Sequence, residues 1–161
     1  MKKEDAIFAA GCFWGVQFYF DQVPGVIATE VGYIGGHTQN PSYEDVCTHT
    51  TGHAEAVKVT FDPSKASYTT LLKHFYRLHD PTQLNRQGPD VGDSYRSAIF
   101  YLNENQKNEA LNAKKAAATD WKDPIVTQIS QAGEFYQAED YHQKFAERTG
   151  RGTCHTPYSP V

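Results

Sequence analysis

Residues 6–15, AIFAAGCFWG, join a run of five apolar residues to a glycine, a cysteine and two aromatic residues. A short apolar run that ends at Gly is typical of a buried strand, and the aromatic-rich segment after it is typical of a helix. This connection would deliver the thiol of Cys12 to the first helical turn, where unpaired N–H groups and the helix dipole stabilise a thiolate. The pattern suggests a reactive Cys12 beside an apolar wall of Phe13 and Trp14. In the alternative, Cys12 is a small buried hydrophobic residue that contributes to packing and has no chemical role.

Composition narrows the class of protein. The chain has 161 residues, 39% of them hydrophobic, which is enough for one domain with a sizeable core. Its net charge of −4 and the lack of a basic run make nucleic acid and anionic membranes poor partners. No apolar run has the length of a membrane span, and the first residues do not resemble a signal peptide. Three widely spaced cysteines are unlike a secreted disulfide framework, so we expect a cytoplasmic protein.

Strand and helix patterns alternate along the chain. Strands are predicted at residues 6–10, 26–33, 54–61, 97–102 and 125–129, and helices at residues 13–21, 42–46, 67–79, 104–119 and 138–148. Residues 82–95 form a long polar connection, and such connections are more often functional than idle. This order predicts an α+β (mixed α/β) single domain, a two-layer sandwich with helices covering a mixed sheet. Residues 1–149 would form the folded unit and residues 150–161 a mobile C-terminal tail.

Glu55 stands out on the predicted strand 54–61, because it shares one face with three apolar side chains. A carboxyl group on such a face stays protonated unless a cation or several donors hold it ionised. Glu55 is therefore a possible general acid. In the alternative, it lies at the partly solvated end of the strand or pairs with Arg86 or Arg96.

Three other kinds of function stay open on the residues alone. Cys47, His49 and His53 form a Cys-x-His-x3-His series, but no second Cys or His cluster follows at zinc-site spacing, so no metal is expected. A Cys-His hydrolase would use Cys12 as an acylated nucleophile and His53 or His142 as the base. In a non-catalytic module with an aromatic-lined pocket, Cys12 would only pack.

Seven short motifs follow one another along nearly the whole chain. They are Gly11-Cys12-Phe13-Trp14-Gly15, Gly32-Tyr33-Ile34-Gly35-Gly36, Pro41-Ser42-Tyr43, Thr51-Gly52-His53-Ala54-Glu55, Asn85-Arg86-Gln87-Gly88, Tyr95-Arg96-Ser97 and Ala138-Glu139-Asp140-Tyr141-His142-Gln143. Together they resemble the peptide methionine sulfoxide reductase A family, whose members reverse the oxidation of methionine for one sulfoxide epimer.

The resemblance implies a role for each matching site residue. Cys12 would attack the sulfur of the S epimer of methionine sulfoxide, and Phe13 and Trp14 would form the pocket for the substrate's methyl group. Glu55 would be the acid, because sulfoxide oxygen leaves poorly until it is protonated.

Three further residues match family positions. Tyr43 and Tyr95 would donate hydrogen bonds from their phenols to the sulfoxide oxygen, and Asp90 would help to hold the substrate and the site. Pro89 departs from the family pattern, which usually has Asn at this position, and leaves the posture of Asp90 open. The resemblance implies no metal and no bound cofactor.

The resemblance also implies how the enzyme would recover. Reduction would leave Cys12 as a sulfenic acid, which condenses with a second thiol to a disulfide. Cys154 in the tail would be this resolving cysteine, and thioredoxin would reduce the disulfide. Some relatives carry two C-terminal cysteines, so a single one indicates a direct Cys12–Cys154 relay. Cys47, next to Val46, is interpreted as a structural residue in a packed segment.

The expected activity is thus thiol-dependent repair of oxidised proteins or peptides, and of free methionine sulfoxide if it fits. The expected partners are those substrates and thioredoxin, and the expected state is a monomer.

Overall fold

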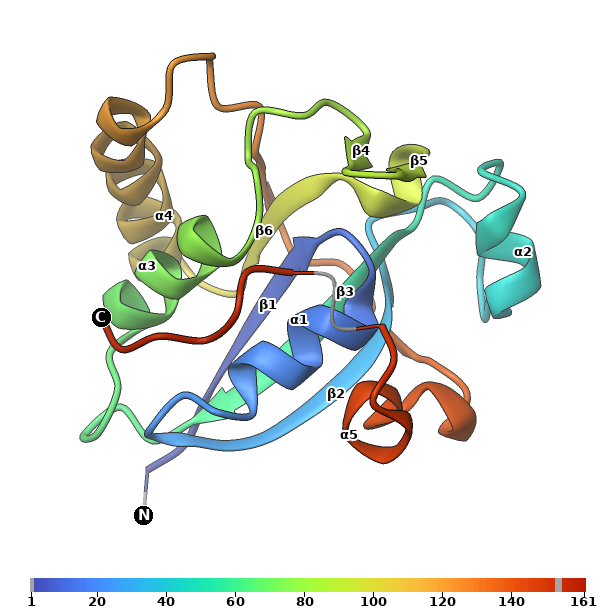
Figure 1. Cartoon of the computed structure of the whole chain (residues 1–161), viewed down its shortest axis with the longest axis horizontal. Coiled ribbons are helices and arrows are strands. Elements are labelled where there is room, and N and C mark those ends of the chain that lie inside the picture. Colours follow the sequence, from blue (N-terminus) through green and yellow to red (C-terminus); the bar gives the residue numbers. More distant parts are fainter. Residues whose placement is uncertain (1, 153–154) are drawn as a thin grey trace.

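The computed structural model describes residues 2–152 and 155–161. Within them lie a six-stranded sheet, a two-stranded hairpin and five α-helices (Figure 1). The helices are α1 Phe13–Phe20, α2 Tyr43–Cys47, α3 Tyr68–Leu78, α4 Glu104–Ala117 and α5 Phe145–Thr149. The strands of the large sheet are β1 Glu4–Ala10, β2 Val26–Ile34, β3 Ala54–Phe61, β6 Ser97–Tyr101, β7 Gln128–Gln131 and β8 Tyr136–Gln137. The hairpin joins β4 Arg86–Gln87 to β5 Asp90–Val91.

The large sheet has the order β7-β6-β1-β3-β2-β8. Four of its five neighbouring pairs are antiparallel, and β6 and β7 are parallel. The sheet is therefore mixed, as predicted. The strand from the opening sequence motif, β1, lies inside it between β3 and β6, which explains why its last five residues are all buried.

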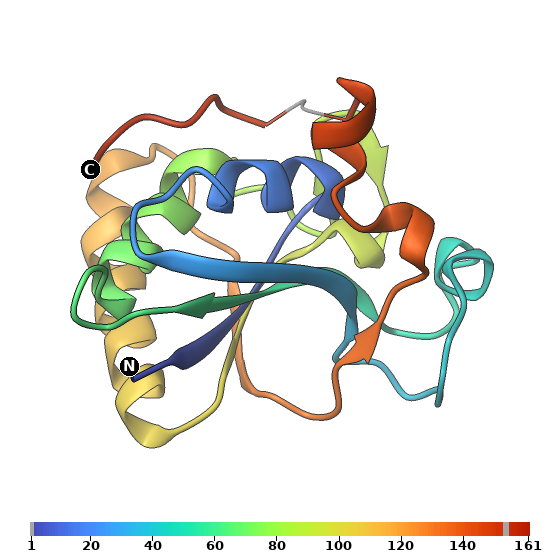
Figure 2. The ribbon, with the colours of Figure 1, turned by 90° about the horizontal axis from the view of Figure 1, so that it is seen from below.

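Helices cover one face of this sheet. Figure 2 shows α1 and α3 on the same side of the strands. Their core centres on Phe8 of β1, whose ring stacks on Phe20 at 5.3 Å and lies 5.4 Å from Phe75. The other face carries a smaller cluster with Ile7 and Phe100, which the coil residues Ala132 and Phe135 cover. The predicted two-layer α+β architecture is confirmed.

Three helices begin directly after a residue whose side chain caps the N-terminus. Ser42 accepts from Asp45 N–H and forms a capping box at α2, Ser67 accepts from Thr70 N–H at α3, and Asn103 caps α4. Each cap satisfies a backbone donor that the helix leaves open. The predicted boundaries of these helices are therefore close to those observed.

The strand predicted at residues 125–129 is shifted. The observed strand, β7, begins at Gln128 and pairs in parallel with β6. Before it, Val126 N–H donates to Pro81 O and Thr127 Oγ1 lies 2.8 Å from Ser97 Oγ. These contacts bury Thr127 and partly bury Ile125 and Val126 without a strand ladder, so their β-branched pattern misled the prediction.

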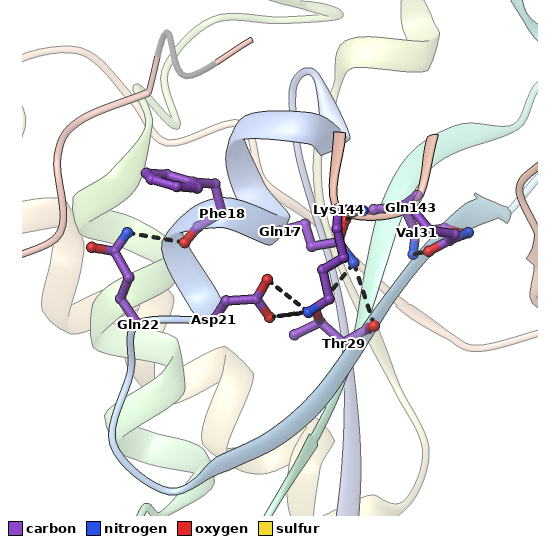
Figure 3. Close-up of polar contacts among 8 residues, drawn as sticks. All are labelled: Gln17, Phe18, Asp21, Gln22, Thr29, Val31, Gln143 and Lys144. Carbon is purple, nitrogen blue, oxygen red and sulfur yellow. Dashed lines mark hydrogen bonds and ion pairs between the residues drawn. The ribbon is translucent and has the colours of Figure 1, made fainter. Parts of the chain in front are cut away.

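The single helix predicted at residues 138–148 is wrong. The structure has a short 3₁₀ helix, Asp140–His142, and then α5. Lys144 lies between them with φ +57°, which interrupts a helix. The side chain of Gln143 takes the place of a strand neighbour, because it bonds both the N–H and the carbonyl of Val31 (Figure 3).

Lys144 joins this segment to α1 and β2 (Figure 3). Its Nζ lies 2.7 and 2.8 Å from the two carboxylate oxygens of Asp21 and 3.0 Å from Thr29 Oγ1. Its backbone N–H donates to Oε1 of Gln17, whose amide group donates to Thr29. Gln17 is only 1% exposed, so these bonds satisfy a buried polar group as well as fixing the segment.

The segment predicted as a loop at residues 82–95 contains the β4–β5 hairpin and a 3₁₀ helix, Asp93–Tyr95. The predicted tail has no helix or strand in residues 150–152, nor in its second described part, residues 155–161. This second part runs along α1 and α3 (Figure 2), where Thr156 N–H donates to Leu78 O and Arg77 donates to Ser159. Position 154 lies outside the described residues. None of the described helices is long and apolar enough to cross a membrane.

Candidate active site

Cys12 is the N-cap residue of α1, and its side chain is half-buried. The preceding turn depends on Gly11, whose φ is +94° and where a Cβ would come within 2.9 Å of the Gln87 side chain. This backbone conformation strains any residue other than glycine. The turn brings Cys12 to the open N–H groups of the first turn of α1, which is the placement predicted from the sequence.

Glu55 is 2% exposed near the start of β3, on the face that the helices cover. Its Oε1 accepts a 3.2 Å hydrogen bond from the backbone N–H of Phe13, the residue after Cys12. Burial raises the pKa of Glu55 to about 8; the Phe13 bond opposes the rise and the charge of Asp90 adds to it. Such a carboxyl group keeps its proton at neutral pH. Glu55 can therefore donate a proton next to Cys12.

The alternative ion pairs of Glu55 are not formed within the described part of the chain. Arg86 donates to a backbone carbonyl of its own hairpin. Arg96 donates to the Gln128 side chain and to the carbonyl of Asp93. Both guanidinium groups hold loops, so neither offsets the cost of burying an ionised Glu55.

Two phenols, Tyr43 and Tyr95, share the surroundings of this acid. Burial raises the pKa of each, and the charge of Glu55 raises each further. The charges of Asp90 and Cys12 also raise the pKa of Tyr95. Both hydroxyl groups therefore keep their protons and can donate hydrogen bonds to a substrate oxygen.

Asp90 reaches the site on the β4–β5 hairpin, opposite Gln87. Gln87 ties this hairpin to the main body, because its side chain accepts from Asp80 N–H at 3.0 Å and donates to Asp80 O at 2.8 Å. Gly88-Pro89 forms the turn between the two strands. Pro89 therefore lies in the turn, and Asp90 still comes near enough to raise the pKa of Glu55.

Aromatic rings form a wall beside Cys12. Trp14 stacks on Phe145 with the ring centroids 3.9 Å apart, and its Nε1 donates a 2.9 Å hydrogen bond to Nδ1 of His142. The Phe13 ring lies 5.8 Å from Tyr33 and 5.2 Å from His142. Phe13 and Trp14 thus belong to one aromatic cluster beside Cys12, and α5 with its preceding 3₁₀ helix supplies partners for their rings.

Two residues of this group, Glu139 and His142, received no role in the site from the resemblance. Glu139 accepts from the Tyr33 hydroxyl at 2.9 Å and from Tyr43 N–H at 3.0 Å. His142 is fully buried, and because its Nδ1 accepts from Trp14, a neutral ring carries its proton on Nε2. Their i, i+3 spacing inside the motif at residues 138–143 was a signal for a shared face.

His53, one of the three residues considered as metal ligands, forms hydrogen bonds with the backbone instead. Nδ1 of His53 accepts from Gly36 N–H at 3.0 Å, and its Nε2 lies 2.7 Å from Thr38 O. Both ring nitrogens thus hold a loop, which disfavours His53 as a catalytic base or a ligand. The described residues contain no cluster of three or more potential ligands from His, Cys, Asp and Glu.

Cys47 differs from its predicted packed position. Its side chain is exposed, and Val46, the preceding residue, is the buried one of the pair. The capping box of α2 fixes which face of that helix turns inward. Partial burial raises the pKa of the Cys47 thiol, and a hydrogen bond with Tyr43 opposes the rise.

Comparison with known proteins gives one consistent result. A family model described as "Peptide methionine sulfoxide reductase" matches residues 4–161. The chain is 53% identical over 156 residues to peptide methionine sulfoxide reductase MsrA of Methanothermobacter thermautotrophicus, covering 96% of this chain and 92% of that protein. It is 59% identical over 149 residues to MsrA of Methanosarcina acetivorans, covering 91% and 79%.

Solved structures agree with the sequence comparisons. Reduced Mxr1 from Saccharomyces cerevisiae matches with a TM-score of 0.93 at 31% identity, covering 98% of this chain and 93% of that chain. Mxr1 in complex with Trx2 matches with a TM-score of 0.67 at 23% identity, covering 98% and 91%, and shows likeness of fold alone.

Proposed function

The chain belongs to the peptide methionine sulfoxide reductase family, and from the geometry of its site we propose that it reduces the S epimer of methionine sulfoxide with Cys12 as nucleophile and Glu55 as acid. It is a methionine sulfoxide reductase enzyme. The hydrogen bond between Phe13 N–H and Glu55 Oε1 carries the proposal, because it joins a buried, protonated carboxyl group to the helix turn that bears the thiol.

The first step transfers oxygen from substrate to enzyme. The Cys12 thiolate attacks the sulfoxide sulfur while Glu55 protonates the sulfoxide oxygen. The resulting hydroxyl group passes to the Cys12 sulfur, and both the S–O bond of the substrate and the transient bond between the two sulfur atoms break. The products are methionine and a Cys12 sulfenic acid, so the substrate sulfur is reduced and the Cys12 sulfur is oxidised. The N-terminal N–H groups of α1 favour the thiolate that begins this step.

Tyr43 and Tyr95 assist by donating hydrogen bonds to the oxygen as it gains negative charge. Burial supports this role, because it keeps both phenols protonated. Phe13 and Trp14 hold the methyl group of the substrate against their rings, and Asp90 helps to hold the substrate and the site. This arrangement explains the selectivity for one epimer. The methyl pocket and the oxygen donors fix two substituents of the sulfoxide sulfur, so Cys12 can attack the sulfur of only one epimer.

Recovery of the thiol completes the cycle. The sulfenic acid of Cys12 condenses with the Cys154 thiol, forms a disulfide and releases water. We propose that thioredoxin then reduces the disulfide, with no metal or bound cofactor. The complex of the similar protein Mxr1 with Trx2 supports thioredoxin as the partner. In this scheme residues 1–149 form the catalytic part of a monomeric, cytoplasmic repair enzyme and residues 150–161 carry the resolving cysteine.

A single turnover without reductant tests the chemistry. In the Cys154→Ser variant, mass spectrometry after acid quenching should find one added oxygen on the peptide containing Cys12 for each methionine formed. The Cys12→Ser, Cys154→Ser double variant is the control and should form no methionine. Formation of methionine without oxidation of Cys12 would contradict the proposal.

A further inference from the structure

His49 follows α2 on the surface with φ +59°, a backbone conformation that residues with a Cβ rarely adopt. Its imidazole lies against the 3₁₀ helix Asp93–Tyr95 and the glycine before it. A Cβ at position 92 would overlap the imidazole ring of His49. The close approach of His49 to this 3₁₀ helix therefore requires glycine at position 92. The close contact brings the chain after α2 directly to the segment that bears Tyr95.

The contacts of this imidazole reach each residue of the 3₁₀ helix. Nδ1 of His49 lies 3.7 Å from Oδ1 of Asp93 and 3.4 Å from Oγ of Ser94. The ring meets that of Tyr95 with the centroids 6.2 Å apart and the planes at 63°. Edge-to-face contact of this kind is favourable between aromatic rings.

The polar contact between His49 and Asp93 involves a buried carboxylate oxygen. This atom, Oδ1 of Asp93, accepts no hydrogen bond from the part of the chain that the structure describes. The group that faces this oxygen is Nδ1 of His49. The backbone carbonyl of Asp93 is held separately, since it accepts from Nη1 of Arg96 at 2.8 Å. His49 therefore adds side-chain contacts to a helix whose backbone is also held by Arg96.

We propose that His49 is a positioning residue for Tyr95. Its ring braces the 3₁₀ helix Asp93–Tyr95 from the solvent side and fixes the direction of the Tyr95 side chain before substrate binds. This inference rests on the proposed function, in which the Tyr95 hydroxyl donates to the sulfoxide oxygen. A donor that is misplaced by a fraction of a hydrogen-bond length stabilises the transition state less, even when the substrate still binds.

Two substitutions separate the parts of this brace. His49→Gly removes the ring and tolerates the positive φ, so it leaves the backbone unstrained. His49→Phe keeps a ring beside Gly92 and Tyr95 and removes the polar contact with Asp93. If His49→Gly does not fold, His49→Asn replaces it, because Asn also tolerates this conformation. Each variant is made with the native Tyr95 and with Tyr95→Phe.

The measurement is the rate constant for methionine formation in a single turnover, together with the substrate concentration at half-maximal rate. With native Tyr95, His49→Gly should lower the rate constant about fivefold, in the range of couplings between contacting residues, and change the half-saturating concentration little. His49→Phe should have a rate constant between those of His49→Gly and the wild type, because it keeps the ring contact with Tyr95 and loses the polar contact with Asp93. In the Tyr95→Phe background, His49→Gly should cause no further loss.

Equal slowing by His49→Gly in both backgrounds would overturn the inference, as would a change in substrate affinity alone or no change at all. If Tyr95→Phe by itself leaves the rate unchanged, both this inference and the proposed role of Tyr95 fail. The Cys12→Ser variant tests the reductase chemistry separately. If it loses activity while the His49 variants behave as wild type, the inference about His49 fails and the proposed chemistry does not.

Discussion

The backbone N–H of Phe13 donates a 3.2 Å hydrogen bond to Oε1 of Glu55, a residue 42 positions later in the chain. This bond spans the two parts of the fold on which the chemistry depends. Phe13 opens α1 directly after Cys12, and Glu55 lies on β3 under the helices. One hydrogen bond from the backbone of α1 to the side chain of Glu55 thus joins the proposed acid to the helix that begins at the proposed nucleophile.

Replacement of Glu55 by Gln should slow the first step strongly and leave the thiol reactive. Gln keeps the size and an acceptor for Phe13 N–H, but it has no acidic proton for the sulfoxide oxygen. Loss of a general acid costs about 100-fold or more. The rate of methionine formation in a single turnover measures the effect, and alkylation of Cys12 by iodoacetamide is the control. Unchanged turnover would remove Glu55 as the acid.

The same carboxyl group should make stability depend on pH. The pKa of Glu55 is raised to about 8 from an ordinary 4.5, so the folded state binds an extra proton between these values. Stability therefore falls as pH rises through this window. Relative to Glu55→Gln, the wild type should lose on the order of 3 kcal/mol between pH 5 and pH 8. Urea unfolding of both proteins at both pH values tests this; parallel curves would contradict a buried, protonated Glu55.

The polar contacts of Gln17 should support both the stability of the fold and the aromatic wall formed by Trp14 and Phe145. Gln17→Leu keeps the volume but leaves Thr29 and the N–H of Lys144 without their partner, which costs about 1–3 kcal/mol. The half-saturating substrate concentration should rise, because Lys144 adjoins the segment that packs on Trp14. The matched control is Gln22→Leu, because the exposed amide of Gln22, just after α1, donates to Phe18 O. Equal unfolding midpoints in the two variants would refute this support.

Cys154→Ser should separate reduction from recovery. The variant should form one methionine per chain and then stop with thioredoxin, since no second thiol resolves the Cys12 sulfenic acid. Dithiothreitol should partly restore cycling. Cys47→Ser, which removes the other remaining thiol, should still cycle with thioredoxin. Normal thioredoxin-driven turnover of Cys154→Ser would assign the resolving role elsewhere.

The sequence predicted the elements whose side chains obey a simple period. The alternation in β3 placed Glu55 on a buried face, and apolar spacing together with capping residues located three helices close to where they lie. In these elements, local pattern and tertiary packing favour the same structure. The turn at Gly11 was equally readable, because a strand, a glycine and a helix meet there within a few residues.

Other parts depend on contacts between distant residues, which no local pattern shows. Gln143 bonds the backbone of Val31 through its side chain, and Lys144 adopts a positive φ while it pairs with Asp21. Both features break the helix that the spacing at residues 138–148 predicted. Their consequence for the site is that His142 comes to rest beside Trp14, a contact separated by 128 positions.

Chiral chromatography shows whether Cys12 reduces a single epimer of methionine sulfoxide. A peptide with racemic methionine sulfoxide is incubated with the protein and dithiothreitol, beside a Cys12→Ser control. We predict that only the S epimer disappears, with an equal yield of methionine, and that the control consumes neither epimer. Consumption of the R epimer, or of neither epimer by the folded wild-type protein, would contradict the account.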